Sequence, residues 1–208
     1  YDHAGNLVQT VPPAGVQVLP LANRTRANAT SHTKKTQYEY NTLKQLVKQT
    51  TPDAGVTTFY YNNVGQLRLS QNARQGSGVY SYTNYDDLGR IIEVGQVSGI
   101  TGSAQDYVNS NPQVNSTSGG VSSYVTKTTY TEPEYQMPQP WQDSHTQRHT
   151  RNRITKTLTD VDGNLTTIED QVVTYYSYDP HGNVEWLVQS LPDGSTQRQN
   201  FLIEYDYD

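Results

Sequence analysis

The sequence predicts an all-β protein built from antiparallel hairpins, on three observations. The chain holds 17 tyrosines among 208 residues, and tyrosine and threonine favour pleated, half-buried surfaces. A motif of tyrosine, then aspartate or asparagine, with glycine four residues after the tyrosine, recurs at intervals of roughly twenty-odd residues. No segment keeps the 3.6-residue apolar period of a helix over more than two turns.

Each copy of the motif predicts a hairpin bend. The acid or amide that follows the tyrosine can bond its own backbone two residues on, which starts a turn, and the glycine supplies the positive φ that closes it. Lys44 stands at the glycine position of one copy. The motif residues are Tyr1, Asp2, Gly5, Tyr40, Tyr61, Gly65, Tyr85, Asp86, Gly89, Tyr178, Asp179 and Gly182, and Tyr207 and Asp208 begin a further copy.

Tyrosines two positions apart share one face of a strand. Stacked across neighbouring hairpins, they predict a tyrosine ladder stabilised by aromatic pairing. The pairs are Tyr38 with Tyr40, Tyr80 with Tyr82, Tyr176 with Tyr178, and Tyr205 with Tyr207.

The repeats divide the chain into three parts. Residues 1–97 are predicted repeat hairpins with a loop excursion at 20–34, residues 98–153 a long insertion, and residues 154–208 further hairpins that stop at the start of another repeat. The insertion is rich in Ser, Gly and Asn at first, which is typical of loops, and its second half is punctuated by proline, which disfavours a central strand. We expect the chain to be part of a longer sheet.

Charge and composition exclude several function classes. A net charge of −5 disfavours nucleic acid as a partner. The absence of cysteine excludes disulfides, thiolate metal sites and cysteine nucleophiles. No run of about 18 apolar residues is long enough to span a membrane.

The candidate enzyme and metal motifs are incomplete. His145 and His149 have the spacing of helical zinc ligands but lack the glutamate that hydrolytic zinc sites place between them. Asp160 and Asp162 resemble the start of a calcium loop, but Gln171 stands where that loop has glutamate. We therefore expect no catalytic residue, no metal site and no cofactor in this segment, and we disfavour an enzyme such as a glycosidase.

The best copy of the motif, Tyr85-Asp86-Asp87-Leu88-Gly89-Arg90-Ile91, resembles the core of the Rhs, or YD-repeat, proteins. The resemblance covers most of residues 1–97 and 154–208, and repetition at near-constant spacing makes it specific. It implies β-hairpins joined edge to edge into part of a spirally wound β-shell with long loop insertions.

The resemblance also carries functional expectations. The shells of bacterial Rhs toxins and of the insecticidal toxin-complex B/C pair enclose a carboxy-terminal toxin, so we expect a structural shell segment of a larger secreted or cell-surface bacterial protein. The expected partners are neighbouring repeats and the enclosed toxin domain, and the resemblance also allows a secretion-system component or an immunity protein. The alternative is a YD-repeat protein, like the teneurins, that binds a cell surface, a carbohydrate or a partner. No stretch matches the family's self-cleaving core with paired aspartates, so a toxin enzyme or autoprotease is expected elsewhere in the parent protein.

Overall fold

The computed structural model describes residues 1–18, 32–114, 121–133, 138, 145–160, 162, 170–193 and 198–207. Asp208, most of the predicted 20–34 excursion and most of the proline-rich stretch after Pro133 lie outside the described residues.

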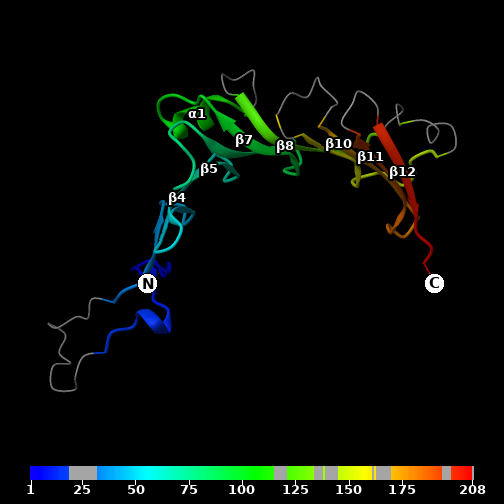
Figure 1. Ribbon diagram of the computed structural model, residues 1–208. Coiled ribbons are helices and arrows are strands. Elements are labelled where there is room, and N and C mark those ends of the chain that lie inside the picture. The colour runs from blue at the N-terminus through cyan, green and yellow to red at the C-terminus, as the bar shows by residue number, and fades with distance from the viewer. Residues whose placement is uncertain are drawn as a thin grey trace. The chain divides into compact units, whose positions relative to one another are not determined.

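The strands form one 12-stranded sheet, ordered along the chain from β1 to β12 (Figure 1). Every pair whose register is described is antiparallel, which is the pattern of successive hairpins. The all-β hairpin fold is therefore confirmed. The elements are β1 (Gln9–Thr10), η1 (Pro13–Gly15, a 3-10 turn), β2 (Thr36–Tyr40), β3 (Leu46–Thr51), β4 (Gly55–Tyr61), β5 (Leu67–Asn72), β6 (Tyr80–Tyr85), β7 (Ile91–Ser98), α1 (Ala104–Ser110), β8 (Val121–Tyr130), β9 (Ile154–Asp160), β10 (Val172–Tyr178), β11 (Val184–Pro192) and β12 (Arg198–Glu204).

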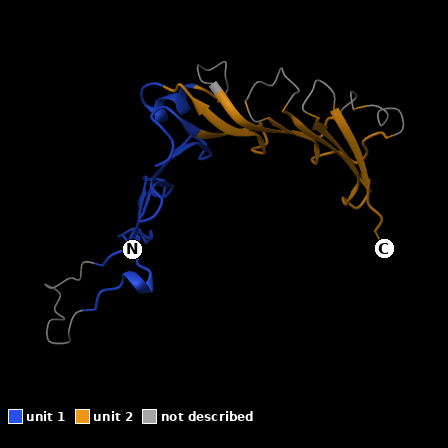
Figure 2. Ribbon diagram, viewed as in Figure 1, with its two compact units in different colours: residues 1–80, 101–110 blue, residues 81–100, 111–208 orange. Residues whose placement is uncertain are grey.

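One compact unit comprises residues 1–80 and 101–110, drawn blue in Figure 2. Its strands β2 to β4 carry mostly half-buried side chains, as expected for a sheet with a thin core. The short helix α1 lies against β4 and β5. Ala104 and Val108 are its buried residues, and their spacing of four places them on one face of the helix.

The second compact unit comprises residues 81–100 and 111–208, drawn orange in Figure 2. Cross-strand register places its core on one face of the sheet, since Tyr175 is opposite Val188 and Val188 is opposite Leu202. The core cluster is Val173, Tyr175, Trp186 and Val188, with Leu158 and Leu202 packed against it. The same registers and strand alternation place threonines on the opposite face: Thr126, Thr128, Thr157, Thr159 and Thr174.

Part of the predicted insertion at 98–153 is regular structure. Residues 104–110 form α1 and residues 121–130 form β8, which pairs with both β7 and β9. Within β8, Val125 is fully buried. This strand is rich in Val, Thr and Tyr, which favour strands. The Ser- and Gly-rich run before it led us to assign the whole region to a loop insertion.

Candidate functional site: the repeated tyrosine turn

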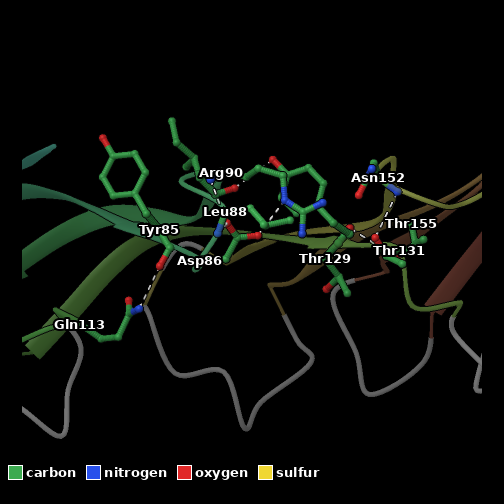
Figure 3. A network of polar contacts seen from close by, with 11 residues as sticks. Tyr85, Asp86, Leu88, Arg90, Gln113, Thr129, Thr131, Asn152 and Thr155 are labelled. Atoms are coloured by element: carbon green, nitrogen blue, oxygen red, sulfur yellow. Dashed lines mark hydrogen bonds and ion pairs between the residues drawn. The ribbon is translucent and has the colours of Figure 1, made fainter. Parts of the chain in front are cut away.

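The turn that begins at Asp86 shows how the motif folds (Figure 3). Oδ1 of Asp86 accepts hydrogen bonds from the backbone N–H groups of Leu88 at 3.0 Å and Arg90 at 2.8 Å. The backbone N–H of Asp86 donates to the carbonyl of Arg90, and the N–H of Gly89 donates to the carbonyl of Asp86, both at 2.9 Å. Gly89 has a φ of 78°, which residues with a Cβ disfavour. Aspartate and glycine therefore close this turn by local contacts.

Four further copies fold in the same way. In each, Oδ1 of the acid or amide accepts the backbone N–H of the residue four positions later at 2.8 to 2.9 Å; the acceptors are Asp2, Asn41, Asn62 and Asp179. The glycine position has a positive φ throughout, with Gly5 at 82°, Lys44 at 62°, Gly65 at 87° and Gly182 at 102°. Lys44 thus adopts the conformation that its copy of the motif requires, at the cost of steric strain.

The residue after the glycine position adds a side-chain contact to each turn. In Asp86, Oδ2 accepts a 2.7 Å hydrogen bond from Nε of Arg90, which is also an ion pair. Amide side chains make the equivalent contact elsewhere: Asn6 with Asp2, Gln45 with Asn41, Gln66 with Asn62, and Asn183 with Asp179, at 2.7 to 2.9 Å. Asn6 and Asn183 donate to the turn aspartate, as Arg90 does, whereas Gln45 and Gln66 accept from the turn asparagine. An amide can therefore stand where the Rhs core has arginine, because it donates to an aspartate or accepts from an asparagine.

The strand pairing next to several of these turns contains a β-bulge. In the pairing of β10 with β11, Ser177 is opposite Trp186 but Tyr178 is opposite Val184, so Glu185 has no residue directly across from it. The same shift occurs at Tyr40, Tyr61 and Tyr130. A bulge bends its strand and redirects the extra side chain.

The motif tyrosines join neighbouring copies through their hydroxyl groups. Five of them donate a hydrogen bond to the backbone carbonyl that lies two residues after the glycine position of the preceding turn. The pairs are Tyr40 to Leu7 (3.0 Å), Tyr61 to Leu46 (3.0 Å), Tyr130 to Ile91 (3.0 Å), Tyr178 to Ile154 (2.8 Å) and Tyr207 to Val184 (3.0 Å). We call these bonds the tyrosine tethers. Because the acceptor is always backbone, the tether tolerates any side chain there.

The tether at Tyr130 reveals a copy that the sequence search missed. Its turn is split: the backbone N–H of Thr131 donates to the carbonyl of Arg153 at 3.0 Å, as Asp86 does to Arg90. Oγ1 of Thr131 accepts the backbone N–H of Asn152 at 3.1 Å (Figure 3). Asn152 has a φ of 59° and so takes the glycine position. Residues 132–151 are therefore inserted within a YD-type turn, and the sequence Asn-Arg-Ile at 152–154 was the available signal.

Arginine after the turn also contacts the next copy. Cζ of Arg90 lies 4.3 Å from the ring centroid of Tyr130, and Cζ of Arg153 lies 5.3 Å from that of Tyr178. Both are within the range of cation–π attraction. Nη2 of Arg153 lies 2.6 Å from where a Cβ on Gly182 would be. Glycine at that position therefore leaves space for the arginine as well as a positive φ.

The charges of the turn follow from these contacts. Partial burial acts to raise the pKa of the Asp86 carboxyl, but hydrogen bonds from the backbone N–H and guanidinium of Arg90 outweigh it and hold this pKa below 3.8. Burial raises the pKa of Tyr178 above 10.0, and the neighbouring Tyr176 adds to this shift. Asp86 is therefore ionised and Tyr178 is a neutral donor at neutral pH.

The metal and enzyme candidates are placed as follows. His145 lies against Glu204 and Trp186. Asp160 and Asp162 each have an oxygen within 4.8 Å of one on Asp170, and within the described part of the chain this is the one group of three that could hold a metal ion. Carboxylates suit calcium or magnesium, but the backbone N–H of Asp162 already donates to Asp170 Oδ2 at 3.1 Å.

Comparisons with known proteins found structural matches alone. No protein-family model and no curated protein sequence matches this chain. A crystal structure of TcdB2-TccC3-TEV matches with a TM-score of 0.45 and 13% identity, over 83% of this chain and 6% of that chain. A crystal structure of TcdB2-TccC3 matches with a TM-score of 0.36 and 12% identity, over 81% of this chain and 9% of that chain. This chain thus spans less than a tenth of either chain's length. None of the described helices is long and apolar enough to cross a membrane.

Proposed function

We propose that this chain is a structural segment of an Rhs-type shell, which encloses or carries a carboxy-terminal toxin or effector domain of a larger secreted or surface protein of bacteria. The observation that carries the proposal is the set of tyrosine tethers. Each links one hairpin to the backbone of the copy before it, at the same point in the repeat.

The tethers favour an extended sheet of repeats over a globular protein with one central core, for a physical reason. An isolated hairpin is marginally stable in water, so each copy depends on contacts with its neighbours. Those contacts repeat along the chain instead of converging on one centre. Our proposal therefore assigns the tyrosines a structural role in every copy.

The faces of the second unit also support this reading. One face holds the core cluster of Val173, Tyr175, Trp186 and Val188. The other carries threonines on β8, β9 and β10. Those at 126, 128, 157 and 159 are at least partly exposed, whereas Thr174 of β10 is buried. An exposed, uncharged hydroxyl surface suits the lining of a container, because it neither repels nor tightly binds a protein cargo.

The test uses the longer polypeptide that contains this segment. Three tethers are removed together by Tyr61→Phe, Tyr130→Phe and Tyr178→Phe, and the rate at which a protease cuts the carboxy-terminal domain is measured. We expect faster cleavage than in the unaltered protein. The matched control replaces three exposed tyrosines, Tyr1, Tyr124 and Tyr205, by phenylalanine and should leave the rate unchanged. Equal protection in the tether variant and the control, or a cargo domain that is fully accessible from the start, would contradict the proposal.

A further inference from the structure

The two faces of the sheet differ in charge over strands β8 to β12. Cross-strand register and strand alternation assign each paired residue to a face. On the face opposite the core cluster, no described residue with a register partner carries a charge at neutral pH. We call this surface the charge-free face. Its residues are Thr126, Thr128, Thr157, Thr159, Val172, Thr174, Tyr176, Leu187, Gln189, Leu191, Gln199, Phe201 and Ile203.

The charged side chains of these strands lie on the other face, together with the core cluster. Register places these there: Lys127, Lys156, Asp160, Arg198 and Glu204. Glu185, at the bulge of β11, lines a cavity with Trp186 and Glu204 and so points to that face too. Residues 145–148 of the insertion lie on the same face, because the ring of His145 meets Trp186 edge-on at 5.4 Å. The charges and the insertion therefore share one face of the sheet.

This distribution is the reverse of what solvent exposure alone predicts. In an antiparallel sheet with one face on a core, polar and charged residues normally occupy the other, solvated face. Here the charge-free face is the more open one: Thr159, Phe201 and Ile203 are exposed, and Thr174 is its one buried residue. The described helix α1 lies against β4 and β5 instead of covering it. An open surface depleted of charged residues is typical of the centre of a protein interface.

The size of the charge-free face indicates what kind of partner it fits. The strands β8 to β12 are neighbours in the sheet, and strands ~4.8 Å apart with about five residues each, at ~3.3 Å per residue, make a face of roughly 400 Å². Two such faces together would bury about 800 Å², less than the ~1,200 Å² at which stable specific complexes begin. A second copy of this chain would therefore bind weakly. A domain of the same polypeptide needs less area, because the covalent connection raises its effective concentration.

We infer that the charge-free face contacts the enclosed carboxy-terminal domain through uncharged side chains, whatever the charge of that domain. This inference rests on the proposed function and adds the chemistry of the contact. Phe201 and Ile203 offer partly exposed apolar surface, and threonine hydroxyls both donate and accept hydrogen bonds. Neither kind of group favours one sign of charge. The contact is therefore not weakened by salt, which screens interactions between charges.

A photo-cross-linking residue tests which face meets the domain. In the longer polypeptide, p-benzoylphenylalanine replaces Thr128 on the charge-free face or, as the matched control, its neighbour Thr129 on the other face. Neither threonine is buried, and adjacent residues of a strand point to opposite faces. After irradiation, mass spectrometry identifies peptides joined to the carboxy-terminal domain. We expect a several-fold higher yield from position 128 than from position 129, and the same yield from position 128 in about 0.05 M and about 1 M NaCl.

Thr159, an exposed residue of the charge-free face, is the second position for the probe and should link the domain as position 128 does. The inference is overturned if neither position links the domain, if position 129 links it equally well, if the links join two separate polypeptides, or if the yield falls several-fold in high salt.

Protection of the carboxy-terminal domain from protease, measured on the same samples, separates this inference from the proposed function. A protected domain that links only from position 129 overturns the inference alone. An unprotected domain overturns the proposed function as well.

Discussion

Gly182 offers a direct test of how one turn contacts the arginine of the turn before it. It has a φ of 102°, and a Cβ added to it would lie 2.6 Å from Nη2 of Arg153. The positive φ costs a residue with a Cβ about 1–2 kcal/mol. Displacing Arg153 from the ring of Tyr178 loses about 0.5–1 kcal/mol of cation–π energy. We therefore expect Gly182→Ala to lower the free energy of unfolding by about 1.5–3 kcal/mol.

A double-mutant cycle separates the two contributions. In an Arg153→Ala background the clash is absent, so Gly182→Ala should cost about 1–2 kcal/mol, the strain alone. Gly5→Ala is the matched control, because its φ is 82° and a Cβ there would meet nothing within 4 Å. Urea unfolding followed by tryptophan fluorescence supplies the free energies, with an unchanged m value as the check that the unfolded state is the same. A coupling energy between positions 153 and 182 no larger than the ~0.3 kcal/mol scatter of independent sites would refute the reasoning.

Three further predictions concern the tyrosines and the turn aspartate. Tyr178→Phe removes the 2.8 Å hydrogen bond to the carbonyl of Ile154 and should lower the free energy of unfolding in urea by about 1 kcal/mol. Burial, aided by a hydrogen bond to a glutamate, raises the pKa of Tyr82 above 10.0 in the folded protein, so this residue stabilises the fold below pH 10 and that stability is lost as pH rises through the folded pKa. Tyr82→Phe should therefore flatten the fall in Tm at alkaline pH. Partial burial acts to raise the pKa of Asp86, but hydrogen bonds from Arg90 outweigh it and hold this pKa below 3.8. The contribution of Asp86 to stability is therefore present above pH 3.8 and is lost as pH falls through the folded pKa. Asp86→Asn keeps the acceptor that other copies use and should remove this acid dependence of Tm without opening the turn.

The hairpins were predictable because their signals are local. An acid or amide, a glycine and the residue that follows it lie within five positions, and all their hydrogen bonds stay inside that span. The strand β8 was not predicted, since the Ser- and Gly-rich run before it dominated the composition of the region. The split turn was missed for a different reason: Thr131 and Asn152 are joined by one hydrogen bond across twenty inserted residues.

Of the candidate site, the sequence indicated the tyrosines but not their contacts. Alternation predicted tyrosine rings stacked in a ladder, and Tyr60 does contact Tyr80 edge-on. The motif tyrosines, however, reach the preceding copy mainly through a hydroxyl on a backbone carbonyl, and two of their rings also meet its arginine. Every residue has a backbone carbonyl, so the sequence does not indicate which one a tyrosine will contact. The contact between Arg148 and Glu185 was not predicted either, because the two residues lie 37 positions apart in the sequence.

Local sequence thus sets where each hairpin bends, because the hydrogen bonds and the positive φ of each turn lie within five consecutive residues. Tertiary structure alone decides which carbonyl each tyrosine reaches and how a bulge places Glu185 out of register. It also decides that residues 145–148 lie beside β11 and β12. Those outcomes depend on the register between strands far apart in the chain, and a shift of one residue in that register would exchange the two faces of the sheet.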